Sequence, residues 1–320
     1  AMELLFILLL ALALDALFGE PPRVVHPVVW MGKVISPLER FAPTSPESSP
    51  SNGGGKVRQL AYGGVMVLLT IFIFASPVYF LLLYVREISP IAYIIVGALT
   101  LKPTFSFREL RRSALEIKVL LTRDNLGEAR AKMPALVSRD TQSLGKPALV
   151  SATVESVAEN ACDSFVAPLF YFLLFGVPGA VVYRVVNTWD AMIGYHEKYE
   201  YLGKCAAKLD DILNFIPARL SGLLLVIAAY VYRRDGKGAW QAMLRDHGKT
   251  ESPNAGWTMS AMAGALRVRL EKVGYYSLGN TNNPLSPQLI VSGIKLAEIA
   301  VLLWVLLCLI VEVMYFVFTA

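Results

Sequence analysis

Three carboxylates follow one another at helical spacing in the middle of the chain. Glu155, Glu159 and Asp163 stand at i, i+4 and i+8, so a helix here would align them along one stripe. Like charges at this spacing repel one another, which indicates that a cation faces them. Carboxylates combined with nucleotide phosphates are typical ligands of Mg²⁺. A solvated face, or ion pairing with Arg139 or Lys146, is the alternative.

Two further groups of polar side chains lie beside apolar segments, where a functional role is the first hypothesis because unpaired charge is costly there. Carboxylates can hold a cation, and an arginine can bind a phosphate ester through two parallel hydrogen bonds. Helix caps and salt bridges within the membrane are the alternative. The first group is Asn187 and Asp190, and the second is Asp210, Asp211, Asn214 and Arg219.

Amide side chains accompany these charges. Asn160 lies beside the carboxylate stripe, and Asn254 lies in the turn-rich segment 252–257, where N–H groups at a helix start can hold an anion. The apolar spacing after Thr258 predicts that this helix extends to Leu270.

Two nucleotide or phosphate motifs fail. The residues before Lys249 lack the first glycine of a P-loop, since Met243 stands there. The stretch from Asp211 to Arg219 mimics a CDP-alcohol phosphotransferase pattern but lacks two of its acids, which weakens a metal site. A membrane phosphotransferase is therefore disfavoured.

The composition indicates that membrane helices position these residues. The chain has 320 residues, of which 55% are hydrophobic and 17% charged, and a mean hydropathy of +0.51. The net charge of +5 is small, so we expect no nucleic-acid partner. The three cysteines and three histidines are scattered, which speaks against a disulfide framework, a thiolate zinc site or a histidine metal cluster.

The apolar runs predict an all-α, polytopic integral membrane protein with about four full transmembrane helices and two broken or re-entrant segments. The segment 164–183 is interrupted by Gly176, Pro178 and Gly179, and 220–232 is short, so we expect both to re-enter. The full spans are expected in the N-terminal run to Asp15, in 61–85, in 88–101 extended through 107, and after Glu298.

Basic residues orient the loops. Five lie in 19–60, ten in 102–146 and eight in 233–290, which places these loops in the cytoplasm. We expect one membrane-embedded domain over 1–320, with a helical cytoplasmic region at 102–163 and a cytoplasmic loop region at 233–288. An amphipathic helix is predicted from Phe107 to Leu121. The Pro-, Ser- and Gly-rich stretch at 43–58 predicts a flexible linker.

Blocks of residues between 15 and about 280 add up to a resemblance. They are Asp15 with GEP (19–21) and HPV (26–28); RDT (139–141); ESVAEN (155–160) with Asp163; APLFY (167–171); NTWDAM (187–192); DDILN (210–214) with IPAR (216–219); SPNAG (252–256); and AMAG (261–264). In this order they are similar to the adenosylcobinamide-phosphate synthase family (CobD/CbiB) of cobalamin biosynthesis. Ala191 and Glu20 depart from the usual Ser and Asp, which bears on packing more than on identity.

The resemblance implies an integral enzyme of the cell membrane that joins the propionate of adenosylcobyric acid to (R)-1-amino-2-propanol O-2-phosphate. ATP with Mg²⁺ would activate the carboxylate, and the amine would attack the acyl phosphate. We expect a multi-pass protein in membrane lipid, with a site open to the cytoplasm. Association with other cobalamin-assembly enzymes or with a second copy is also expected.

Each candidate has an expected role in that chemistry. Glu159 and Asp163 are the expected Mg²⁺ ligands. Glu155, Asp190 and Asp211 are the expected catalytic carboxylates: Glu155 supports the metal or acts as a base for the ammonium, and the two aspartates hold a second cation or the incoming amine. The residues expected to bind phosphate or substrate are Arg139, Asn160, Asn187, Asn214, Arg219 and Asn254. A transporter of corrinoid or another small molecule is the alternative, since broken helices and embedded acids are also typical of a substrate path.

Overall fold

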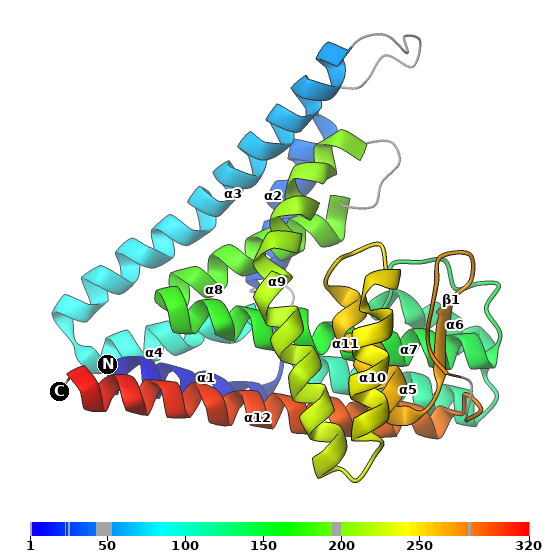
Figure 1. The fold of residues 1–320 in the computed structure, drawn as a ribbon. Helices are drawn as coiled ribbons and strands as arrows, with labels where there is room; N and C mark the ends of the chain where they lie inside the picture. Colours follow the sequence, from blue (N-terminus) through cyan, green and yellow to red (C-terminus); the bar gives the residue numbers. More distant parts are fainter. Residues whose placement is uncertain are drawn as a thin grey trace. The chain divides into compact units, whose positions relative to one another are not determined.

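The computed structural model describes residues 2–319 except 23, 25, 43–52, 194–199 and 281–282. The described chain is almost entirely helical (Figure 1). Its α-helices are α1 (Met2–Phe18), α2 (Pro27–Arg40), α3 (Gly53–Ile88), α4 (Pro90–Leu101), α5 (Arg108–Thr122), α6 (Leu126–Lys132), α7 (Lys146–Ala161), α8 (Ala167–Ile193), α9 (Glu200–Val231), α10 (Gly236–Asp246), α11 (Ala255–Leu266) and α12 (Pro287–Thr319). Short helical turns are η1 (Lys102–Thr104), η2 (Met133–Ala135), η3 (Cys162–Val166) and η5 (His247–Lys249), and the strands are β1 (Arg269–Lys272) and β2 (Tyr276–Gly279).

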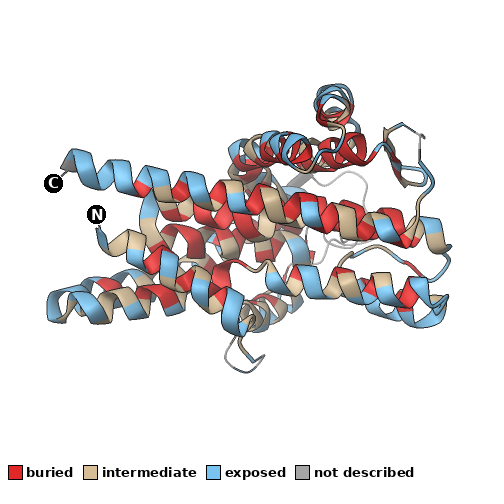
Figure 2. Cartoon of the chain, turned by 90° about the horizontal axis from the view of Figure 1, so that it is seen from below, coloured by how far each residue is buried: buried red, intermediate tan, exposed pale blue. Residues whose placement is uncertain are grey.

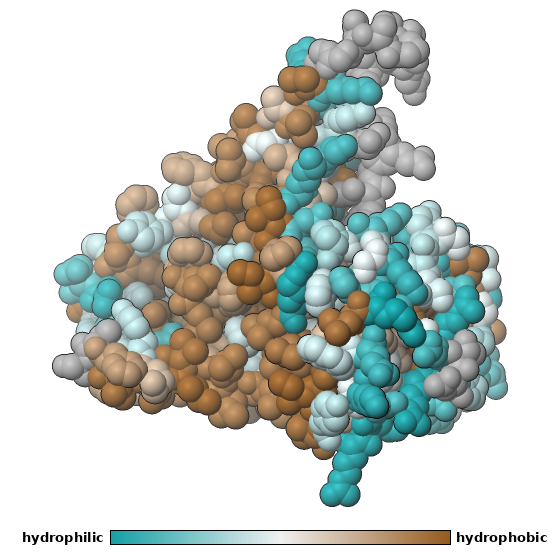
Figure 3. Space-filling model, in the orientation of Figure 1, coloured by the Kyte–Doolittle hydropathy of each residue, from teal (hydrophilic) through white to brown (hydrophobic). Residues whose placement is uncertain are grey.

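The fold is that of an all-α polytopic membrane protein, as the sequence predicts. Among the described residues, five stretches are long and apolar enough to cross a membrane: Gly55–Ile88, Pro90–Thr122, Lys146–Ile193, Tyr201–Val231 and Pro287–Phe318. Only 22% of the most apolar part of α3, and likewise of α12, is buried. Apolar side chains cover the visible faces of both helices (Figure 3). Apolar surface on this scale indicates contact with lipid.

Five candidate spans stand beside the expected four full helices and two re-entrant segments, and re-entry stays a prediction. The segment 164–183 belongs to the long run Lys146–Ile193, and 220–232 is largely the end of the 32-residue helix α9. The expected break near Gly176 is confirmed, because this residue has a non-helical backbone (φ 66°, ψ −162°) inside α8. At 17 residues, α1 is not among the five candidates, since a span needs about 20 residues.

The loop boundaries also shift. The candidate spans Pro90–Thr122 and Lys146–Ile193 extend into 102–163, which the sequence assigns to the cytoplasm. The expected cytoplasmic loop region 233–288 contains α10, α11 and a hairpin, and its side of the membrane stays a prediction. Because α3 begins at Gly53, the last part of the expected linker 43–58 is helical, and 43–52 lie outside the described residues.

The chain divides into two compact units, and its expected organisation as one membrane-embedded domain stays a prediction. Unit 1 comprises Ala1–Phe105, Pro168–Leu213 and Glu312–Ala320. Unit 2 comprises Ser106–Ala167 and Asn214–Val311. Helices α9 and α12 each contribute residues to both units.

The core of unit 1 forms among α2, α3, α8 and the first half of α9. Its largest fully buried side chain is Trp189, and Ile35 and Val185 are also completely buried. Helix α3 approaches α9 closely at Gly63, where a Cβ atom would lie 2.3 Å from the backbone oxygen of Leu202. The glycine is therefore required for this packing.

Unit 2 is built around α7, which packs against α5, α11 and β1. The predicted amphipathic helix is confirmed as α5, and it buries Leu110, Ala114, Ile117 and Leu121 at the expected spacing. Buried and exposed residues alternate around the helices in Figure 2 as this periodicity requires. Helices α10 and α11 touch at Gly264, where a Cβ atom would lie 2.2 Å from a backbone oxygen of α10.

A hairpin replaces the predicted end of the helix at Leu270. Helix α11 ends at Leu266 because Arg267 takes the left-handed conformation (φ 56°), and the Val268 amide bonds the Ala263 carbonyl oxygen at 3.0 Å. Leu270 then lies in β1, opposite Leu278 of the antiparallel β2. This two-stranded antiparallel sheet is the only sheet in the described residues.

Candidate active site

A polar window opens on an otherwise buried helix in unit 2. Every residue in 149–169 is buried except Glu159, Asn160, Asp163 and Ser164, which are half-buried. The Ser164 hydroxyl donates to Asn160 Oδ1 at 3.0 Å, and Asn160 Nδ2 donates to the Ser156 carbonyl oxygen at 3.0 Å. The amide is thus held in one orientation between two carboxylates. We call these four residues the polar window.

The polar window coincides with a π-helical turn that the sequence explains. Pro168 has no N–H to donate to the Ser164 carbonyl four residues earlier, and its ring would clash with that carbonyl in a regular α-helix. The turn η3 widens instead, and the Ser164 carbonyl oxygen accepts a hydrogen bond from the Ser106 backbone amide at 2.8 Å. Single π-turns within helices occur frequently at functional sites.

Glu155, one turn earlier, has a different environment. It is 4% exposed, and its carboxylate accepts hydrogen bonds from the Ser151 hydroxyl at 2.6 Å and the Tyr276 hydroxyl at 2.7 Å. Arg139 Nη2 lies 3.3 Å from Glu155 Oε2. We call this arrangement the Glu155 node. The alternative of pairing with Arg139 is therefore what the structure shows, whereas Lys146 pairs with Asp124.

Tyr276 joins the Glu155 node to its surroundings. Burial raises the pKa of its hydroxyl above the ordinary range, and the charge and hydrogen bonding of Glu155 raise it further. The charge of Glu159 acts in the same direction, so the polar window lies within electrostatic range of this hydroxyl. The hydroxyl also lies 3.9 Å from the Met259 sulfur on α11.

Arg219 and Asn254 form a second pair of expected residues that the structure brings together. Arg219 Nη1 lies 3.3 Å from Asn254 Oδ1, at the residue that precedes α11. The guanidinium stacks over the ring of Phe215 at 3.5 Å and lies 4.8 Å from that of Trp257. Trp257 Nε1 is a buried donor without an acceptor in the described residues. The set presents a cation and a spare N–H beside a helix N-terminus, which suits a phosphate.

The remaining expected residues are placed differently. In unit 1, Asn187 accepts from Arg184 at 3.1 Å and donates to Asp210 at 3.3 Å. The acid that it contacts is thus Asp210, one residue before the expected Asp211. Asp190 and Asp211 are both half-buried. In unit 2, Asn214 is 2% exposed and lies within α9.

The comparison with protein families decides the chain's relationship. The model of the CobD/Cbib protein family matches residues 8–303. The chain belongs to the CobD/CbiB family. The resemblance found in the motif blocks is therefore confirmed.

Relatives in this family cover nearly the same length. A protein from Dehalococcoides mccartyi named "Cobalamin biosynthesis protein CobD" is 54% identical over 98% of this chain and 99% of the relative. The "Probable cobalamin biosynthesis protein CobD" of Methanothermobacter thermautotrophicus is 40% identical over 94% and 95%. That of Methanocaldococcus jannaschii is 41% identical over 86% and 88%. No solved structure matches the chain.

This CobD/CbiB chain also contains a buried ion cluster that sequence reasoning missed. The Lys102 amine, 5% exposed, lies 3.0 Å from Asp15 Oδ1 and 3.0 Å from Glu20 Oε1. His26 Nε2 contacts the other oxygen of Glu20, and its Nδ1 accepts from the Val28 amide. Asp15, Glu20 and His26 stand in the motif blocks. The sequence does not reveal this role of Lys102, because the residue is one of ten basic residues in 102–146 and their number favours a cytoplasmic loop.

The carboxylates of the described residues do not form a complete metal cage. In the part that the structure describes, no group of three or more His, Cys, Asp or Glu side chains is placed to hold a metal ion. Mg²⁺ in nucleotide enzymes usually takes one or two carboxylates and completes its shell with phosphate oxygens and water. Glu159 and Asp163 fit that smaller requirement, and their role as ligands stays a prediction.

Proposed function

We propose that this protein is an ATP-dependent amide ligase of cobalamin biosynthesis, an adenosylcobinamide-phosphate synthase. It would join the amine of (R)-1-amino-2-propanol O-2-phosphate to the propionate of adenosylcobyric acid. Membership of the CobD/CbiB family carries the biosynthetic role. The polar window carries the choice of a ligase, because it offers two carboxylates and an oriented amide for a nucleotide complex.

The reaction needs an activated acid, since a carboxylate is a poor acyl donor. A propionate oxygen would attack the γ-phosphorus of ATP, giving an acyl phosphate and ADP. The neutral amine would then attack the acyl carbon, the carbon–oxygen bond to phosphate would break, and the amine would lose a proton. Inorganic phosphate and the amide are the products. Positioning and charge neutralisation dominate the first of these steps.

The residues of unit 2 suit the phosphoryl-transfer step. Glu159 and Asp163 would hold Mg²⁺, which neutralises charge on the transferred phosphoryl group when bound with ATP. Asn160 would donate to a phosphate or substrate oxygen. Arg219, stacked on Phe215, would bind a phosphate with the help of Asn254 and the start of α11. Glu155 would support the site from within the protein rather than act on substrate.

The expected residues of unit 1 suit recognition of the amine. Asp190 and Asp211 are acids that would attract its ammonium group, and Asn187 is held between Arg184 and Asp210 in a fixed orientation. Location in the cell membrane, with the ATP-binding residues open to the cytoplasm, belongs to the same proposal. The five apolar stretches support the membrane location.

The test is a direct assay of the full chain. The detergent-solubilised protein is incubated with adenosylcobyric acid, aminopropanol phosphate, ATP and Mg²⁺, and the corrinoid is followed by mass spectrometry. A mass gain equal to the amide, dependent on ATP, is the expected result. Corrinoid that binds but never gains mass would overturn the ligase and favour a carrier.

A further inference from the structure

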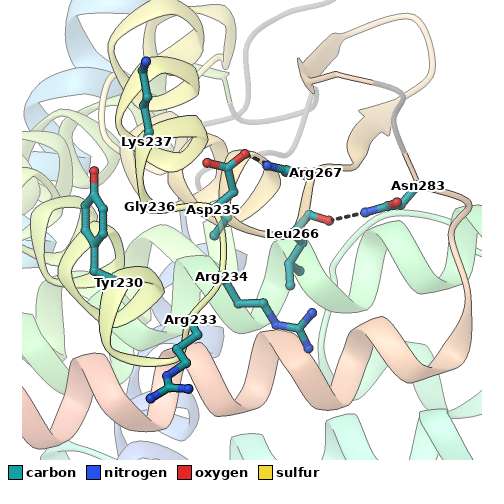
Figure 4. A pocket seen from close by; sticks show the side chains of 10 residues that line it. Tyr230, Arg233, Arg234, Asp235, Gly236, Lys237, Leu266, Arg267 and Asn283 are labelled. Atoms are coloured by element: carbon teal, nitrogen blue, oxygen red, sulfur yellow. Dashed lines mark hydrogen bonds and ion pairs between the residues drawn. The ribbon is translucent and has the colours of Figure 1, made fainter.

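A basic hollow lies where α9 turns into α10 in unit 2. Its volume is about 510 Å³, and it is lined by Arg233, Arg234, Lys237 and Arg267 together with Tyr230 and Asp235 (Figure 4). Hydrophilic side chains gather at this end of α9 in Figure 3. None of these residues belongs to the candidate active site, so the hollow needs its own explanation.

The charges of the hollow do not balance. Asp235 is its single acid, and it is already engaged: Oδ1 accepts from the Gly238 amide at 2.7 Å and Oδ2 from Arg267 Nε at 2.6 Å. The hydrogen bond donated by the Gly238 amide lowers the pKa of Asp235. Burial raises this pKa, and the hydrogen bond from Arg267 lowers it again. Asp235 is thus ionised and neutralises Arg267, which leaves three cations in excess.

Those three cations keep their charge available. Arg234 Nη2 donates to the neutral Ser292 hydroxyl at 3.0 Å. The side chain of Arg233 is exposed and makes no hydrogen bond or ion pair within the described part of the chain, and Lys237 is also exposed. Arg233 and Arg234 extend from the turn in one direction and Lys237 in another, so they flank the hollow from different sides (Figure 4). An anion within the hollow would therefore have positive charge on two sides.

The position of the hollow indicates where that anion comes from. Leu223, Ile227 and Tyr230 follow one another at spacings of four and three, and all are at least 41% exposed. They form an apolar outer face of the candidate span Tyr201–Val231, and that face ends at Arg233. Tyrosines are enriched at the level of lipid headgroups, and basic residues just beyond a span face the headgroup phosphates. A lipid beside this face would have its headgroup at the hollow.

We propose that the hollow binds the phosphate of an anionic lipid headgroup. Arg233 and Arg234 provide the principal contacts, and Lys237 adds charge. The N-terminus of α10 plays no part, because Asp235 already caps it. The proposal does not depend on the amide-ligase activity, since it concerns different residues and is tested without substrate.

Native mass spectrometry of the full chain in detergent micelles tests the proposal. Phosphatidylglycerol and phosphatidylcholine with identical acyl chains are added at equal concentration, and the bound lipid is identified and quantified from the mass of the complex. We expect phosphatidylglycerol to be retained preferentially. The double variant Arg233→Gln/Arg234→Gln should bind it more weakly by about fivefold for each cation removed.

A matched control removes the same charge elsewhere. Lys118 and Arg123 lie at the end of another candidate span, Pro90–Thr122, and outside the hollow. Lys118→Gln/Arg123→Gln should retain phosphatidylglycerol as the unchanged protein does. Both double variants should show the thermal unfolding midpoint of the unchanged protein, so that a loss of lipid is not a loss of fold.

Three results would overturn the proposal. Equal retention of the two lipids would show that the protein does not select lipids by the charge of the headgroup. Unchanged retention by Arg233→Gln/Arg234→Gln would place any anionic lipid elsewhere. Displacement of phosphatidylglycerol by millimolar inorganic phosphate, with direct phosphate binding, would assign the hollow to a soluble anion instead.

Discussion

Glu155 and Glu159 stand one helical turn apart on the same helix, yet one belongs to the interior and the other to the polar window. Glu155 is 4% exposed and bound by a serine, a tyrosine and an arginine. Glu159 is half-buried beside Asn160 and Asp163. The contrast teaches that acids at helical spacing along one stripe can differ in burial, one enclosed by the protein and the others partly exposed.

The difference arises from what covers each end of the helix. The Glu155 node is closed by Tyr276 of β2 and by Arg139, which comes from the segment before α7. At the polar window the helix widens into η3, because Pro168 cannot complete the regular hydrogen-bond pattern. One carboxylate is therefore enclosed by tertiary packing, and the next two, which we call the open carboxylates, are half-buried.

The largest expected effect is on stability at the enclosed carboxylate. Glu155→Ala should lower the free energy of unfolding by about 3–5 kcal/mol, because it leaves the partly buried charge of Arg139 unpaired. Thermal unfolding in detergent measures this loss. The same change at the open carboxylate, Glu159→Ala, should cost about 1 kcal/mol, as a typical point substitution does, because this side chain is only half-buried. Equal losses at the two positions would contradict the distinction between them.

The next effect is on turnover at the open carboxylate. Glu159→Gln keeps the shape of the side chain and removes the charge proposed to hold Mg²⁺ with ATP. We expect kcat for amide formation to fall about 10²–10³-fold, as when one preorganised charge-stabilising group is lost. Glu116→Gln, at a surface ion pair with Lys132, is the matched control and should leave kcat unchanged. Near-normal turnover of Glu159→Gln would remove the polar window from the mechanism.

The two carboxylates also show what the sequence can predict. Helical periodicity predicts Glu155 and Glu159 on one helix, as it predicts the buried residues of α5, and Asp163 follows in the π-helical turn η3. Local chemistry likewise predicted the break at Gly176. These features depend on residues within a few positions of one another, which is why one sequence suffices.

The burial of each carboxylate and the side chains that contact it cannot be predicted in this way. Tyr276 lies 121 residues from Glu155, and Lys102 lies 82 residues from Glu20, so no local pattern joins them. The hairpin was missed because the apolar spacing through Leu270 suits a helix, whereas the left-handed Arg267 ends that helix. Such pairings are set by tertiary packing, which a single sequence does not display.

A smaller effect is expected at the hydroxyl that closes the Glu155 node. Tyr276→Phe removes one hydrogen bond to a buried carboxylate, so the free energy of unfolding should fall by about 1.5–3 kcal/mol. Its neighbour Tyr275 is 61% exposed, and Tyr275→Phe should change the stability by less than about 0.5 kcal/mol. Turnover should stay within a few-fold of normal in both variants. A large fall in kcat for Tyr276→Phe, with unchanged stability, would move this residue from the interior into the catalytic machinery.

The smallest effect is a dependence of that stability difference on pH. Burial, and then the charge of Glu155, raise the pKa of Tyr276 in the folded protein, whereas an unfolded tyrosine ionises near pH 10. Above pH 10 the unfolded chain therefore loses a proton that the folded protein keeps, and the stability falls by up to about 1.4 kcal/mol per pH unit. Tyr276→Phe lacks this proton, so its stability does not fall in this way. The difference in stability between the two proteins should therefore stay constant below pH 9 and narrow between pH 10 and 11; we call this difference the gap. Thermal unfolding of both proteins across this range measures the gap. A gap that is constant or widens above pH 10 would show that the hydroxyl is not shielded, and the enclosed and open carboxylates would then differ less than their contacts indicate.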